Sequence, residues 1–146
     1  RHFQYFIEGD SIDVLVKSKK GDENKKKPIF FSVQGSLGVP LLIHNGKQRV
    51  KYSTLEEGFV EDDYHLIIVN KPGIPLISHK DSLSNRGEYY DHKSQKIYPK
   101  EYVNKNYSEY YVKRNISVIE LLLKESWVDS SKIIVSGHSQ GSGIAA

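Results

Sequence analysis

The chain has 146 residues, 38% of them hydrophobic and 27% charged, with a formal net charge of +3. These values are typical of a soluble globular protein and give no support to a nucleic-acid-binding role, and no apolar run reaches the ~18 residues of a membrane span. Cysteine is absent, which excludes disulfides and thiolate metal sites but leaves a cytoplasmic and a secreted or periplasmic location equally open.

The first residues predict a β-hairpin over residues 2–17. FQYFI and SIDVLVK are rich in β-forming residues, the second with period-two alternation, and the turn signal Glu8-Gly9-Asp10-Ser11 lies between them. After a lysine-rich loop, PIFFSV (28–33) is a short apolar run of the kind found in a strand buried on both faces, as in a parallel sheet.

The middle of the chain predicts a short helix, a strand and a long loop. Ser53 and Glu56 form a capping-box signature, and Gly58 can end the helix that they begin. YHLIIVN (64–70) predicts a second buried strand. Residues 73–106 are polar and irregular, too long for a plain connection, so we expect them to pass over the active-site side of the fold.

The last third predicts a helix over 107–126 and a third buried strand over 132–136. The apolar face of the helix is expected to carry Val112, Ile116, Ile119 and Leu123, which are spaced at helical periodicity. The alternation of strands and helices predicts an α/β fold with a mostly parallel sheet behind the N-terminal antiparallel hairpin.

The strand at 132–136 runs into Gly137-His138-Ser139-Gln140-Gly141, which fits the G-x-S-x-G pattern. In a strand-to-helix turn of this kind the serine is held in a strained backbone conformation with its hydroxyl exposed. Glycines two residues away on either side keep side chains out of the crowded turn. We therefore predict that Ser139 is a nucleophile, supported by Gly137, His138 and Gly141.

With this motif and order of elements, the chain resembles the serine α/β-hydrolase superfamily over nearly its whole length. The resemblance implies that residues 1–146 are the N-terminal part of a single α/β-hydrolase domain, with about five of its eight core strands. Arg1 in place of an initiator methionine is in keeping with a trimmed or partial chain.

The resemblance also implies an oxyanion hole formed by backbone N–H groups. The family's loop after the third strand usually begins His-Gly, and here the corresponding residues are Gln34, Gly35 and Ser36. The N–H groups of Ser36 and Gln140 would be the two donors, since only main-chain groups are needed. An ordinary turn at residues 34–36 is the alternative.

The function that the resemblance implies is cleavage of a carboxylic ester, or a related acyl bond, through an acyl-enzyme on Ser139. The triad acid and histidine follow the nucleophile in the family's chain order, so both are expected beyond residue 146, and the 146-residue chain alone is expected to be inactive. A small-molecule ester or acyl compound is the expected substrate. No cofactor is implied, and the oligomeric state stays open. The alternatives are a non-catalytic relative that only binds, or a serine peptidase of the same fold.

Two other motifs compete with this interpretation. Gly141 to Ala146 spell G-x-G-x-x-A, a dinucleotide-binding pattern, but the first glycine lies five residues past Ser136, so close packing of a helix explains it better. The residues of a conceivable metal set lie in a polar loop without helical spacing, and we predict no metal site; they are His79, Asp81, Asp91 and His92. Seven tyrosines between Tyr89 and Tyr111 are expected to fold back onto the domain, with a ligand-binding surface as the alternative.

Overall fold

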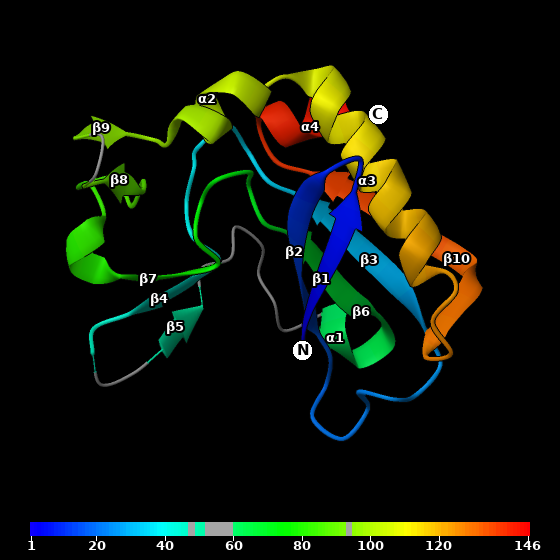
Figure 1. Ribbon diagram of the computed structural model, residues 1–146. Coiled ribbons are helices and arrows are strands. Elements are labelled where there is room, and N and C mark those ends of the chain that lie inside the picture. Colours follow the sequence, from blue (N-terminus) through cyan, green and yellow to red (C-terminus); the bar gives the residue numbers. More distant parts are fainter. Residues whose placement is uncertain (47–48, 52–59, 93–94) are drawn as a thin grey trace.

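The computed structural model describes residues 1–46, 49–51, 60–92 and 95–146. A five-stranded mixed sheet in the order β1-β2-β6-β3-β10 forms the centre of the molecule (Figure 1). Its strands are β1 (His2–Ile7), β2 (Asp10–Lys17), β3 (Lys27–Val33), β6 (His65–Val69) and β10 (Val128–Gly137). β2 pairs antiparallel with β1 and β6, whereas β6, β3 and β10 run parallel to one another.

Short strands and helices lie around this sheet. A second sheet, in the order β5-β4-β7, is made of β4 (Leu42–His44), β5 (Arg49–Lys51) and β7 (Ile77–His79). β8 (Tyr90–Asp91) pairs with β9 (Lys96–Ile97). The helices are α1 (Val60–Asp63), a 3₁₀ turn (Lys80–Ser82), α2 (Lys100–Lys105), α3 (Ser108–Leu122) and α4 (Gln140–Ala145).

The central sheet is covered on both faces. α3 and α4 pack on one face, where the side chains of Phe31, Ile67 and Val118 are fully buried (Figure 1). A smaller apolar cluster on the other face contains Leu66 and Leu41. Every residue of β6 is buried, as expected for a strand with neighbours on both edges and layers on both faces.

The hairpin and the two central strands confirm the sequence analysis. Glu8 and Gly9 form the hairpin turn with φ of 50° and 88°, the positive values that a two-residue turn needs to match the twist of its strands. The apolar runs at 28–33 and 64–70 coincide with β3 and β6.

The expected parallel character of the sheet is only partly met. Two of the four neighbouring strand pairs are antiparallel, because β2 of the hairpin pairs directly with β6. The expectation of a buried last strand is wrong. β10 lies at the edge of the sheet, and the side chains of Ile133 and Val135 are 37% and 40% exposed.

The helix expected at 107–126 is present as α3, but the expected packing face is only partly correct. Ile119 and Leu123 pack against the core as expected. Val112 and Ile116 are 36% and 51% exposed, whereas the buried residues are Tyr111, Arg114, Asn115, Val118 and Leu122. An arginine and an asparagine belong to the packed face because their polar groups are satisfied there, which a count of apolar residues cannot show. The Arg114 guanidinium donates to the Asn70 carbonyl oxygen at 2.8 Å.

The two remaining expectations concern the middle of the chain. The capping-box helix at Ser53, Glu56 and Gly58 lies outside the described residues. Residues 73–106 were expected to be irregular, but they contain β7, the 3₁₀ turn, β8, β9 and α2. Strands of two or three residues are too short to produce a visible alternation in a sequence.

Candidate active site

Ser139 lies between the end of β10 and the first residue of α4. Its φ of 54° and ψ of −123° belong to a region that residues with a Cβ rarely occupy, and holding a residue there costs about 1–3 kcal/mol. The expected backbone geometry at Ser139 is therefore present. The Ser139 side chain is exposed at this junction, next to the carboxyl end of β3.

The glycines of the motif are required by close backbone contacts. A Cβ on Gly137 would lie 2.0 Å from the Gly141 carbonyl oxygen, and one on Gly141 would lie 2.3 Å from the Val33 carbonyl oxygen. Gly141 thus lets the start of α4 pack directly on the end of β3. His138 fixes the same junction through its backbone N–H, which donates to the Val33 carbonyl oxygen at 3.1 Å.

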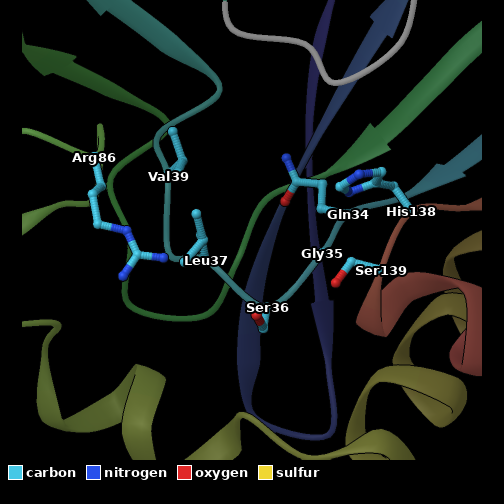
Figure 2. A pocket seen from close by; sticks show the side chains of 8 residues that line it. All are labelled: Gln34, Gly35, Ser36, Leu37, Val39, Arg86, His138 and Ser139. Carbon is cyan, nitrogen blue, oxygen red and sulfur yellow. The ribbon is translucent and has the colours of Figure 1, made fainter.

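A cavity of about 260 Å³ opens beside Ser139 (Figure 2). It lies between the loop after β3, the junction of β10 and α4, and the segment before β8. Its lining residues are Gln34, Gly35, Ser36, Leu37, Val39, Arg86, His138 and Ser139. Gly35 approaches the junction closely, since a Cβ there would lie 3.3 Å from the Ser139 Cβ. Two segments that are more than a hundred residues apart in the sequence therefore form one site.

The predicted oxyanion donors are partly brought together. Ser36 lines the cavity with Ser139, whereas Gln140 is not among the lining residues. Within the described part of the chain, no backbone acceptor is found for the N–H of either Ser36 or Gln140. Their role as an oxyanion-binding pair stays a prediction.

Tyr102 supports the loop that carries Ser36. This side chain is 2% exposed, and its hydroxyl donates to the Ser36 carbonyl oxygen. Burial raises the pKa of the Tyr102 phenol, which therefore stays protonated and able to donate. The ring stacks at a tilt against Tyr98, with 4.5 Å between ring centroids. The tyrosine-rich segment thus folds back onto the domain beneath the cavity loop.

The Ser139 hydroxyl has no hydrogen-bond partner among the described residues. His138 is the one histidine that lines the cavity, and no carboxylate lines it. The side chains of His138 and Gln34 both line the cavity (Figure 2). The described lining therefore supplies a serine and a cavity, without a base held against that serine.

Two cations are buried close to this site. Lys71 is 4% exposed, and its ammonium lies 4.2 Å from the centre of the Tyr111 ring. Arg114 lies over the same ring at 4.9 Å. Burial, and then the charge of Arg114, lower the pKa of Lys71 to about 7. A small cavity lined by both cations is also lined by Gln34, in the loop after β3.

Sequence reasoning missed Lys71, Arg86 and Arg114 as residues at or beneath the site. A lysine followed by Pro-Gly is indistinguishable from a solvated turn residue. Arg86 lies in the polar segment that was expected to pass over the active-site side, but no signal in the sequence showed which of its residues would reach the cavity. Tyr102 belonged to the tyrosine-rich stretch, which was the one available signal for it.

Residues of the dinucleotide-binding pattern and of the conceivable metal set have packing and hydrogen-bonding contacts of their own. Gly141 has a packing role against β3, whereas a Cβ on Gly143 would meet nothing within 4 Å. His79 lies against His44, with 5.1 Å between ring centroids, and its Nδ1 is 3.3 Å from an Asp81 carboxylate oxygen. Among residues 1–46, 49–51, 60–92 and 95–146, no three His, Asp or Glu side chains are grouped closely enough to hold a metal ion.

Comparison of the chain with models of known protein families, with curated proteins and with solved structures gives no match. In the described part of the chain, no helix is both long and apolar enough to cross a membrane.

Proposed function

We propose that the protein is a serine hydrolase of the α/β-hydrolase type that cleaves a carboxylic ester, with Ser139 as the nucleophile. The observation that carries the proposal is the backbone of Ser139, whose φ of 54° and ψ of −123° hold the residue at a strand-to-helix junction facing a cavity. Strain of this kind persists where the surrounding structure enforces it, and it concentrates at functional sites.

The arrangement of elements supports the same function. The candidate nucleophile follows β10, the outermost strand of the sheet, and the candidate oxyanion loop follows its neighbour β3. Because the two strands are parallel, their carboxyl ends lie next to each other. In open α/β sheets, ligands bind beyond the carboxyl ends of the parallel strands. The strand order, with an antiparallel hairpin at one edge and parallel strands toward the nucleophile, fits the family that the motif suggests.

In the proposed reaction, the Ser139 Oγ attacks the ester carbonyl carbon while a base accepts the hydroxyl proton. The C–O bond to the alcohol then breaks, and the alcohol leaves with the proton from that base. Water, deprotonated by the same base, attacks the acyl-enzyme and releases the carboxylic acid and Ser139. We assign the base and its orienting acid to residues outside 1–146, because the described lining of the cavity holds no carboxylate and only His138 as a histidine.

In this proposal the backbone N–H of Ser36, a residue that lines the cavity, donates to the developing oxyanion. Tyr102 supports the same residue through the Ser36 carbonyl oxygen, which belongs to the following peptide group. Removing one such donor in a serine hydrolase typically costs 10²- to 10³-fold in kcat. The N–H of Gln140 is the second donor in this proposal.

Hydrolysis of p-nitrophenyl esters tests the proposal. The full-length protein should release p-nitrophenol, and Ser139→Ala should reduce kcat by at least about 10⁴-fold, as expected for the loss of a triad nucleophile. Residues 1–146 alone should show no turnover above the Ser139→Ala level. Equal rates for the full-length protein and its Ser139→Ala variant would refute the proposal.

A binding module without catalysis is the second candidate. It is favoured by one observation, that the described lining of the cavity contains no carboxylate that could orient a base toward Ser139. If the full-length protein binds an ester in this cavity but does not hydrolyse it, the result would support the binding module over the esterase.

A further inference from the structure

Arg86 gives the cavity beside Ser139 a positive charge. Of the lining side chains, it is the one with a permanent charge, and its neighbours in the lining are apolar or neutral. Figure 2 shows its guanidinium extending past Val39 toward Leu37, on the opposite side of the hollow from Ser139. A ligand with its reacting carbonyl at Ser139 would therefore extend toward a cation.

The backbone position of Arg86 is fixed by a hydrogen-bonded turn. The Ser84 hydroxyl accepts from the backbone N–H of Arg86 and from that of Glu88, both at 3.2 Å. The N–H of Gly87 donates to the Ser84 carbonyl oxygen at 2.9 Å, and the N–H of Ser84 donates to the Glu88 carbonyl oxygen at 2.8 Å. The arginine thus projects from an ordered turn.

The Glu88 carboxylate lies near the Arg86 guanidinium without forming a hydrogen bond with it. The closest approach is 3.9 Å, between the Arg86 Nε and a Glu88 carboxylate oxygen, which is too long for a hydrogen bond. The Glu88 carboxylate instead accepts from the hydroxyls of Tyr98 and Ser84. The Arg86 side chain is 72% exposed, and no hydrogen bond of its guanidinium is found within the described residues.

We propose that Arg86 is a specificity-determining residue that selects small esters carrying a carboxylate, bound with the carboxylate at Arg86 and the ester carbonyl at Ser139. This inference rests on the proposed esterase function and names its substrate class. The planar guanidinium matches a carboxylate with two parallel hydrogen bonds. The volume of about 260 Å³ suits a short dicarboxylate monoester rather than a long acyl chain.

The test measures binding without turnover. Monomethyl succinate and dimethyl succinate differ by one charge, and each is titrated into isotope-labelled full-length Ser139→Ala protein. The amide signals of Gly35 and Ser36 report occupancy of the cavity in NMR spectra. The monoanion should bind about tenfold more tightly than the diester, a preference expected for one charge-assisted contact at a partly exposed site.

Arg86→Gln should remove this preference, and Arg86→Lys should keep part of it. Lys80→Gln is the matched control, because Lys80 is also exposed and also lies 3.9 Å from a carboxylate, that of Asp81, but does not line the cavity. It should leave the preference unchanged. A preference that survives Arg86→Gln, or that Lys80→Gln removes equally, would overturn the inference.

The two proposals fail in different ways. Binding is read in a protein that cannot form an acyl-enzyme on Ser139, so a lost preference in Arg86→Gln supports the inference whether or not the wild-type protein hydrolyses esters. Conversely, ester hydrolysis that depends on Ser139 but shows no selection by charge would leave the esterase proposal standing and remove this one.

Discussion

Replacing Lys71 with methionine should stabilise the protein strongly at neutral pH. The lysine is 4% exposed and lies against an aromatic ring, with the charge of Arg114 nearby. Burial therefore makes its protonated form unfavourable in the folded state. Methionine keeps an unbranched side chain of similar length against Tyr111 and removes the charge.

The size and pH dependence of the effect follow from the pKa of Lys71. A value of about 7 in the folded protein against an ordinary 10.5 corresponds to a cost of about 5 kcal/mol at the most. Below about pH 7 both the folded and the unfolded state bind the proton, and the full cost is present. Between about pH 7 and 10.5 only the unfolded state binds it, so the cost shrinks as the pH rises.

Urea unfolding of the wild-type and Lys71→Met proteins between pH 6 and 10 measures this difference. The Lys71→Met protein should be more stable by several kcal/mol at pH 6, and the advantage should fall by about 1.4 kcal/mol per pH unit above pH 7. Lys80→Met, at an exposed lysine, controls for the loss of a positive charge. A difference between wild type and Lys71→Met that is independent of pH would refute the reasoning.

Two further substitutions test the construction of the site. Gly141→Ala should destabilise the fold by about 3 kcal/mol in denaturant unfolding, because the added Cβ would meet the backbone of β3. Gly143→Ala, whose added Cβ meets nothing within 4 Å, should be neutral or slightly stabilising. Equal effects of the two substitutions would contradict the packing argument. Tyr102→Phe should cost about 1–2 kcal/mol and slow ester hydrolysis by the full-length protein, whereas Tyr107→Phe, at a tyrosine that is 50% exposed, should do neither. Unchanged hydrolysis in Tyr102→Phe would show that the loop at Ser36 does not need the hydrogen bond from Tyr102 to the Ser36 carbonyl oxygen.

The parts of the fold that follow from local pattern were predictable. The hairpin and the junction at Ser139 are marked by a glycine or turn signal in the expected place, and β3 and β6 are marked by continuous apolar runs. The strained φ of Ser139 follows from the G-x-S-x-G spacing, because only that spacing relieves the crowding around the turn.

The rest depends on contacts between distant segments. The buried face of α3 was predicted one residue out of place. Arg114 is buried there because its guanidinium donates to the distant Asn70 carbonyl oxygen, and it also donates to the side chain of its neighbour Asn115. Ile133 and Val135 are exposed because β10 is the outermost strand, although the apolar run at 132–136 predicted a buried strand. Arg86 lines the cavity because its segment is joined to the loop after β3, where the backbone N–H of Tyr89 donates to the Gly38 carbonyl oxygen at 2.9 Å.

Labelling with a fluorophosphonate tests the central claim, that Ser139 is an activated nucleophile, most directly. The phosphorus reacts only with a serine whose proton is removed as it attacks, and the adduct is found by mass spectrometry of the intact protein and its peptides. The full-length protein should gain one adduct, mapped to Ser139, and Ser139→Ala should gain none, while Ser131→Ala, at an exposed serine on β10, should react like the wild type. An adduct on another serine, or none on the folded full-length protein, would contradict the account.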